Sequence, residues 1–125
     1  MIFYYYWLIK KEFRKKSPSY FSYKSLSSSA VADVILHSKA ILDIQHPRQT
    51  GLTMRTIETL GARKKLITTN RDIVNYDFYN SHNIAMIDRE KPKIESDFWE
   101  TNYENINSSV FDKYNITNWI LTLFN

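Results

Sequence analysis

The sequence has no cysteine, only two glycines and three prolines, and no apolar run long enough to span a membrane. Without cysteine the chain forms neither a disulfide framework nor a thiolate metal site, which is compatible with a reducing compartment. The apolar stretch Met1 to Ile9 (MIFYYYWLI) is too short to cross a bilayer, which takes about 20 residues. Its charges follow it instead of preceding it, so it does not have the pattern of a secretory signal peptide.

Several common ligand motifs are also missing. There is no Walker loop, no G-x-G-x-x-G phosphate loop and no Asp-x-Asp. No cluster of His, Cys and Asp has metal-ligand spacing, so a protein-held metal is not indicated and no cofactor is expected. A response-regulator scaffold is disfavoured because the acidic cluster that it needs at its strand ends is absent.

The composition is that of one folded domain. The chain has 125 residues, of which 43% are hydrophobic and 15% aromatic, and this excludes a disordered tail. The formal net charge is +4, and basic residues cluster in Lys10 to Lys16 (KKEFRKK) and Arg63 to Lys65. This excess suits an anionic partner, whether a nucleotide-sugar, a membrane surface or a nucleic acid, and does not choose among them.

Short apolar runs alternate with segments of helical periodicity. We expect strands at Met1–Ile9, Ala40–Ile44, Lys65–Thr69 and Ile84–Ile87. We expect helices from about Lys24 to His37, from Thr50 to Gly61, from Arg71 to Tyr76, and in two further segments that begin near Ser108 and Thr117. The stretch Arg89 to Asn107 is predicted as a loop with some helix.

This alternation predicts an α/β fold. We expect a single Rossmann-like domain, with a mostly parallel sheet, helices on both faces and right-handed crossovers. Its parts are a strand and basic loop at 1–23, core βα units at 24–88, and a C-terminal loop and helices at 89–125. An alternative for 1–23 is an interfacial membrane anchor made by the aromatic run together with KKEFRKK.

Within the predicted helices, the apolar spacing indicates which side is buried. In the first helix the expected stripe consists of Leu26, Ala30, Val31, Val34 and Ile35. In the second helix Met54, Ile57 and Leu60 should face the core, with Gly61 as the left-handed stop. Lys64 and Lys65 precede a strand at its far end and are predicted to be solvated.

The stretch Asp43 to Glu58 (DIQHPRQTGLTMRTIE) combines a strand end, a polar loop and a helix start. In an open α/β sheet this junction lies at the carboxyl end of the strands, where ligands bind. The unpaired N–H groups of a helix's first turn favour an anion there, so we expect phosphate.

The block from Ser38 to Asp88 resembles the carboxyl-terminal domain of bacterial glycosyltransferases of the two-Rossmann-lobe (GT-B) type. The likeness is to capsular and lipopolysaccharide biosynthesis proteins with a similar DIQHP-x-QTGLTMRTIE-x-LG-x-x-KKLITTN block. Its order is a strand, a Gln-Thr-Gly loop, a helix with an internal glutamate, a glycine, and a strand that ends in Thr-Thr-Asn. The resemblance implies that the donor phosphates are bound by Gln49, Thr50, Gly51, Leu52 and Thr53, and the ribose by Glu58.

The spacing of three residues in the second helix is compatible with this assignment. Gly51, Arg55 and Glu58 are separated by four and three residues and so share one helix face. Arg55 would meet a diphosphate bidentately and Glu58 would accept hydrogen bonds from two hydroxyls. The alternative is a stabilising Arg55–Glu58 ion pair with Thr50 as an ordinary helix cap.

Four further residues are candidates for accessory contacts. His46 and Arg48 lie in the loop at the presumed ligand end, where either would donate to phosphate, although a structural role for His46 stays open. Thr69 and Asn70 end the next strand on the same side, and Asn70 is also a helix-cap candidate.

The expected function is donor binding in bacterial surface polysaccharide synthesis, with a nucleotide-sugar as the substrate. Catalytic residues are not identified, because the general base of such enzymes normally comes from the other lobe, and an isolated lobe is not expected to transfer sugar unaided. The implied partner is an N-terminal acceptor lobe or a partner chain. The implied location is the cytoplasm, at the inner face of the membrane if there is peripheral contact.

The alternative function is a basic nucleotide- or nucleic-acid-binding module without enzymatic activity. Nine tyrosines and three tryptophans would stack on bases. Against nucleic acid, the aromatic residues do not interleave with Lys and Arg in a recognisable motif.

Overall fold

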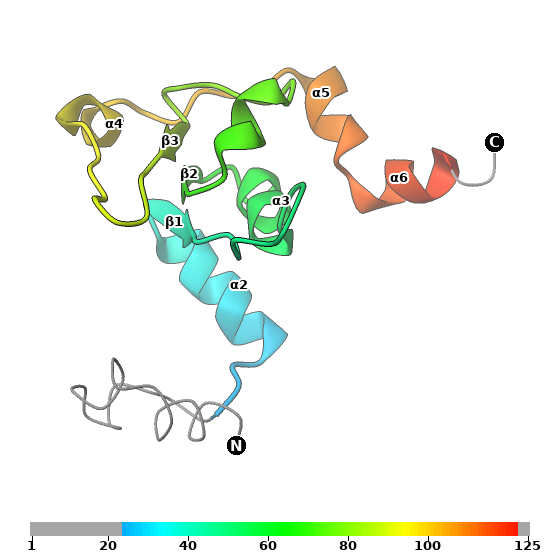
Figure 1. Cartoon of the computed structure of the whole chain (residues 1–125). Coiled ribbons are helices and arrows are strands. Elements are labelled where there is room, and N and C mark those ends of the chain that lie inside the picture. The colour runs from blue at the N-terminus through cyan, green and yellow to red at the C-terminus, as the bar shows by residue number, and fades with distance from the viewer. Residues whose placement is uncertain (1–23, 123–125) are drawn as a thin grey trace.

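The structure is a computed structural model that describes residues 24–122, so the strand expected at 1–9 lies outside the described residues. It is an α/β arrangement (Figure 1). In chain order the elements are α2 (Ser28–His37), β1 (Ala40–Asp43), α3 (Met54–Gly61), β2 (Lys65–Thr68), the 3-10 helix η2 (Arg71–Asn75), β3 (Ile84–Met86), α4 (Ser96–Glu100), α5 (Ser108–Lys113) and α6 (Ile116–Thr122).

The three described strands form one sheet in the order β1-β2-β3, and both pairings are parallel. Ile41, Leu66 and Ile84 lie side by side across it. The strands were predicted because each is a short apolar run between polar residues, and their positions and the parallel α/β class are confirmed. All three therefore end at the same edge, and the loops that follow them leave from that edge.

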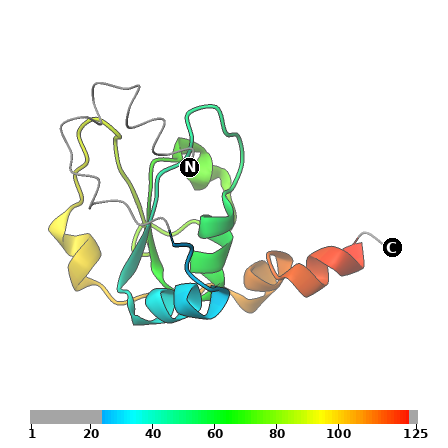
Figure 2. The ribbon, with the colours of Figure 1, turned by 90° about the horizontal axis from the view of Figure 1, so that it is seen from below.

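Helices lie on both faces of this sheet. Leu66 packs with Leu60 of α3, whereas the preceding residue Lys65 donates from Nζ to the Phe98 carbonyl of α4. Neighbouring residues of a strand point to opposite faces, so α3 and α4 lie on opposite sides of β2. Figure 2 shows the strands between these two helices.

The main core lies on the α3 face. Its buried members are Leu60, Leu66, Ile73, Phe78 and Ile84. Helix α5 closes this core, since Val110, Phe111 and Tyr114 pack against it. Helix α6 extends away from the body of the domain (Figures 1 and 2).

Helix α3 begins later than predicted. Its cap is Thr53, whose hydroxyl accepts from the Thr56 N–H, and the helix starts at Met54 instead of Thr50. Met54 was expected in the core, but it is 73% exposed. The expected burial is correct for Leu60, which is 7% exposed.

The end of α3 also differs. Gly61 is still helical, and the left-handed residue is Arg63, with φ 52°. The N–H of Arg63 donates to Leu60 and that of Lys64 to Thr59, which is a Schellman motif. The Arg63 guanidinium lies over the Phe111 ring at 5.3 Å and anchors this turn.

Lys65 is buried and not solvated as predicted. It is 7% exposed, and its Nζ donates to the Thr101 hydroxyl at 2.7 Å as well as to Phe98. Burial lowers the pKa of Lys65 from its ordinary value. The prediction failed because the far end of β2 is covered by α4, which sequence pattern assigned mainly to loop.

Side-chain caps mark the starts of α2, η2 and α5. Asn70 accepts from the Asp72 N–H at the start of η2, as predicted. Helix α5 begins at Ser108, where a helix was expected, and its cap is Asn107. In α2 only Ile35 is buried and Val34 is 57% exposed, while Leu26 precedes the helix and is 66% exposed, so the predicted stripe is only partly correct.

Candidate functional site

A polar recess lies at the carboxyl edge of the sheet. It is formed by the chain that follows each of the three strands, and its volume is about 240 Å³. The lining residues are Gln45, His46 and Pro47 after β1, Thr69 and Arg71 after β2, and Ile87, Asp88 and Arg89 after β3. Figure 2 shows the loops after β1 and β3 leaving the sheet at one end. This edge is where ligands bind in open α/β sheets.

Gln45 organises the loop after β1. Its backbone N–H donates to the Thr69 hydroxyl at 3.0 Å, which joins the loops after β1 and β2. Its side-chain amide donates to the carbonyls of Gln49 and Gly51 at 3.1 and 3.0 Å. Gly51 has φ 79°, and its carbonyl also accepts from the buried Asn70 side chain at 3.2 Å. The side-chain amides of Gln45 and Asn70 therefore hold the loop in one shape.

A buried carboxylate lies under the start of α3. Asp43 is 6% exposed, and its Oδ2 accepts from the hydroxyls of Thr53 at 2.6 Å and Thr56 at 2.8 Å. A negative charge at a helix N-terminus is favourable because it faces the positive end of the helix dipole. The backbone N–H groups of Met54 and Arg55 donate to no acceptor within residues 24–122. The protein's own carboxylate therefore lies close to the start of α3, where its negative charge would repel an anion that approached these two amide groups.

The recess is mainly cationic. Arg89 donates from Nη2 to the Gln45 carbonyl and so connects the loops after β1 and β3. The Arg71 Nη2 lies 3.3 Å from Asp88 Oδ2, and the Arg71 side chain is 83% exposed. The His46 Nδ1 accepts from the Arg48 N–H at 3.2 Å, which leaves Nε2 as the donor of the neutral ring. The recess therefore contains two guanidiniums, one carboxylate and one imidazole, and its net charge is positive.

Asp88 is held in its charged form. Its Oδ1 accepts from the backbone N–H groups of Glu90 at 2.8 Å and Lys91 at 3.1 Å. These two bonds, with the attraction of Arg71, hold the pKa of Asp88 below its ordinary value of 3.8. The carboxylate cannot turn away from the recess without losing them.

The predicted residues divide into several groups. His46 and Thr69 line the recess. Arg48 is exposed on the same loop and contacts His46 only through its N–H. Asn70 is 2% exposed and braces the loop from inside.

The residues assigned to the donor phosphates lie beside the recess and do not line it. Gln49 and Gly51 are joined to it through the Gln45 side chain, and Thr50 is exposed between them. Leu52 packs against the main core, and the Thr53 hydroxyl is bonded to the Asp43 carboxylate.

Arg55 and Glu58 form an ion pair of 2.9 Å on α3, where each side chain is 42% exposed. The ion pair of the structural alternative is therefore present, whereas its expected cap Thr50 is wrong because Thr53 caps the helix. The Glu58 carboxylate is not buried, so it stays accessible to a ligand, but it does not line the recess.

Arg71, Asp88 and Arg89 were missed as site residues. A signal was present, because each lies within three residues of the end of a predicted strand on the ligand side. The sequence did not show that these charged residues share one site, because they follow different strands.

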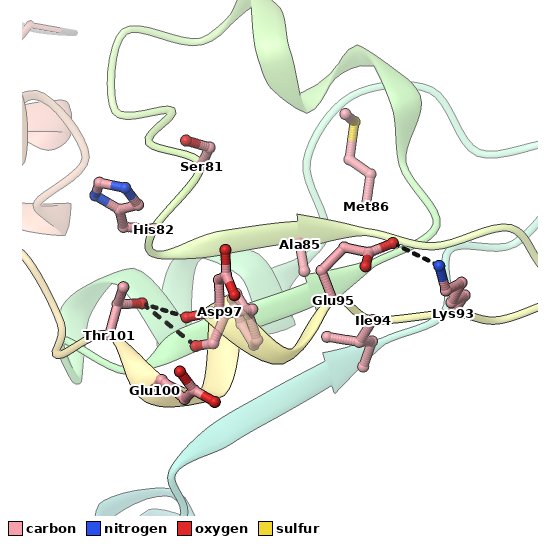
Figure 3. Close-up of a pocket in the computed structure, with 11 residues that line it drawn as sticks. Ser81, His82, Ala85, Met86, Lys93, Ile94, Glu95, Asp97, Glu100 and Thr101 are labelled. Carbon is pink, nitrogen blue, oxygen red and sulfur yellow. Dashed lines mark hydrogen bonds and ion pairs between the residues drawn. The ribbon is translucent and has the colours of Figure 1, made fainter.

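The hollow between β3 and α4 is larger but acidic. Its volume is about 550 Å³, and Figure 3 shows Glu95, Asp97 and Glu100 around it. Its one lysine, Lys93, is paired with Glu95 at 2.9 Å. A phosphate would be repelled there.

A third concavity, between α3 and α5, is apolar. It has a volume of about 760 Å³ and is lined by Met54, Ile57, Phe111 and Ile116 among others. It offers little to hold an anion. The recess at the strand ends is therefore the candidate site for an anionic ligand.

Comparison with known proteins gave no relative: no family model, no curated protein and no solved structure matches the chain. Within residues 24–122 no three His, Asp or Glu side chains come together so as to hold a metal ion. None of the helices in that range is long and apolar enough to cross a membrane.

Proposed function

We propose that this chain is the donor-binding lobe of a glycosyltransferase and holds a nucleoside diphosphate sugar at the carboxyl edge of β1, β2 and β3. The observation that carries the proposal is the convergence of three loops on one cationic recess. In this proposal the domain is Rossmann-like and forms the carboxyl-terminal half of a GT-B architecture. The resemblance of Ser38 to Asp88 to capsular and lipopolysaccharide glycosyltransferases supports the sugar-transfer role.

The diphosphate is bound by Arg71 and Arg89 in this proposal. Guanidinium groups present paired N–H donors that match phosphate oxygens bidentately. Arg71 is long, exposed and bonded to Asp88 over 3.3 Å, so it can turn to a ligand at little cost. His46 Nε2 adds a third donor from the loop after β1.

Binding near this edge, rather than directly on the α3 N-terminus, follows from Asp43. A phosphate on the first turn of α3 would approach a buried carboxylate bonded to Thr53 and Thr56. Like charges at short range repel strongly where water is excluded. In this proposal the loop Gln49–Thr53 acts mainly by shaping the recess. Direct contacts from its amides to the phosphates stay a prediction of the resemblance.

The lobe's chemical contribution is electrostatic. In sugar transfer the bond between the sugar and the diphosphate breaks, and negative charge develops on the departing phosphate. Fixed guanidinium groups would stabilise that charge. Activation of the acceptor needs a general base from an acceptor lobe or partner chain, so the 125-residue chain alone should bind the donor without transferring sugar.

A thermal-shift and calorimetric screen of the purified chain against UDP, GDP, CMP and ADP tests the proposal. A ligand at 100 times its Kd stabilises a folded protein by about 2.7 kcal/mol, which is readily measured. We expect stabilisation by at least one nucleoside diphosphate and a loss of affinity of roughly tenfold or more in Arg71→Ala or Arg89→Ala.

One variant serves as a control for charge, and a second variant tests the ribose contact. Lys91→Ala removes a nearby positive charge outside the recess lining and should change affinity less than either arginine variant. Glu58→Ala tests the ribose contact implied by the resemblance. If no nucleotide stabilises the chain at millimolar concentration, or if oligonucleotides bind instead with steep salt dependence, the proposal is wrong.

A further inference from the structure

The recess contains one carboxylate among its cationic groups, and a pure phosphate site has no use for it. Asp88 lies two residues after the end of β3, and two backbone N–H groups fix its Oδ1 in place. A negative charge beside two guanidinium groups weakens the attraction for any phosphate. Its presence is explained if the ligand carries a second group that a carboxylate binds.

Sugar hydroxyls are such a group. A carboxylate oxygen has two lone pairs and only accepts, so a single such oxygen can accept hydrogen bonds from two adjacent hydroxyls of one ring. In dinucleotide-binding folds an acidic residue about 20 residues after the phosphate loop performs this task for the ribose 2′-hydroxyl. Asp88 has comparable surroundings, since it lies near a strand end in the same recess as the guanidinium groups of Arg71 and Arg89.

Glu58 is less suited to the same role. It lies on α3, is bonded to Arg55 at 2.9 Å, and does not line the recess that holds Arg71 and Arg89. Asp88 shares that recess with both arginines. The Oδ2 atom of Asp88 is bonded to Arg71 at 3.3 Å, a long contact that a phosphate would replace.

We propose that Asp88 accepts hydrogen bonds from the ribose hydroxyls of the nucleotide and gives the recess its preference for ribonucleotides. When the Arg71 guanidinium turns to the diphosphate, Oδ2 of Asp88 becomes free for the sugar. The carboxylate is therefore a binding residue and not only the partner of Arg71. This inference rests on the proposed function, because it requires that the recess binds a nucleotide.

The test compares ribonucleotides with their 2′,3′-dideoxy forms. UDP, GDP, CDP and ADP and the four dideoxy analogues are titrated by calorimetry into the full chain and into Asp88→Asn. Paired ligands have equal charge, so their affinity ratio does not respond to a general change in electrostatics. For the nucleotide that binds best, the wild-type chain should prefer the ribose form by roughly tenfold or more, since two hydrogen bonds to a charged group are lost in the dideoxy form.

Asp88→Asn should reduce that preference to less than about threefold. Asparagine keeps an oxygen that can accept from Glu90 and Lys91, so the turn should be retained. Its affinity for pyrophosphate should rise, because one negative charge is removed from the recess. Glu90→Gln removes a neighbouring charge outside the recess lining and should leave the ribose preference unchanged.

The possible failures are distinct. If neither pyrophosphate nor any nucleotide binds the wild-type chain, the proposed function is wrong. If nucleotides bind without a ribose preference, or if Asp88→Asn keeps the preference, the role of Asp88 is wrong and the phosphate site stands. Loss of the preference in Glu58→Gln would then assign the ribose contact to Glu58.

Discussion

Replacing Asp43 by alanine should destabilise the domain by about 2–4 kcal/mol, since hydrogen bonds to a charged group contribute about 1.5–3 kcal/mol each. The Asp43 carboxylate is 6% exposed and accepts from Thr53 at 2.6 Å and Thr56 at 2.8 Å. Two such bonds are lost together. Part of the loss is recovered, because the two threonine hydroxyls lie 3.2 Å apart and can donate to each other.

Related variants divide this effect into its parts. Asp43→Asn keeps the volume and one accepting oxygen, so its cost should be lower, about 1–2 kcal/mol. Thr56→Val keeps the shape and removes one donor at a residue that is 1% exposed, with a similar expected cost. In the double variant Asp43→Ala/Thr56→Val the two effects should be less than additive, because they remove the same bond.

Urea denaturation followed by far-UV circular dichroism measures these free energies of unfolding. A total stability of about 5–15 kcal/mol is typical of a single domain, so the expected losses are large enough to resolve. If Asp43→Ala costs less than about 1 kcal/mol, or if its effect simply adds to that of Thr56→Val, the carboxylate does not hold the start of α3 as described.

Three further predictions concern the core, the loop and the response to acid. Ile73 is 0% exposed, so Ile73→Ala should cost about 2–5 kcal/mol in urea denaturation, and a cost below about 1 kcal/mol would contradict its place in the core. Gly51 has φ 79°, and nothing lies within 4 Å of the position that a β-carbon would take. Gly51→Ala should therefore cost about 1–2 kcal/mol through backbone strain alone. A stabilising effect would show that the loop has another shape. Hydrogen bonds from Asn80 and His82 hold the pKa of Glu104 below its ordinary value of 4.5. A carboxylate with a lowered pKa stabilises the folded state above its unfolded pKa, and this contribution is lost as pH falls through the folded pKa. The difference in free energy of unfolding between the wild type and Glu104→Gln should therefore shrink below about pH 4. A difference that stays constant from about pH 6 to about pH 3 would contradict the bonds described.

The strands could be predicted because their signal is local. Each of β1, β2 and β3 is a short apolar run between polar residues, and three such runs alternating with helical patterns predict a parallel sheet. The start of α3 could not be predicted in the same way. Thr50 and Thr53 are both good caps, and the choice between them depends on Asp43, which lies ten residues before Thr53 in the chain.

The location of the candidate site was predicted better than its residues. The carboxyl edge of the sheet was expected from topology, and His46 and Thr69 do line the recess there. Arg71 and Arg89 were not expected, because their place in one recess depends on how the chain bends after β2 and after β3. Gln45 was also missed as the organiser of its loop, since its bond to the Gly51 carbonyl leaves no periodic pattern in the sequence.

The central claim is that the recess after the three strands holds the diphosphate of a nucleotide. Titration of the isotope-labelled chain with UDP, GDP, CDP and ADP, followed by amide chemical shifts in NMR spectra, tests it most directly. For a nucleotide that binds, the account predicts that the largest shifts occur at Gln45, His46, Thr69, Arg71 and Arg89. Largest shifts at Met54, Arg55 and Glu58, with the recess unchanged, would contradict it.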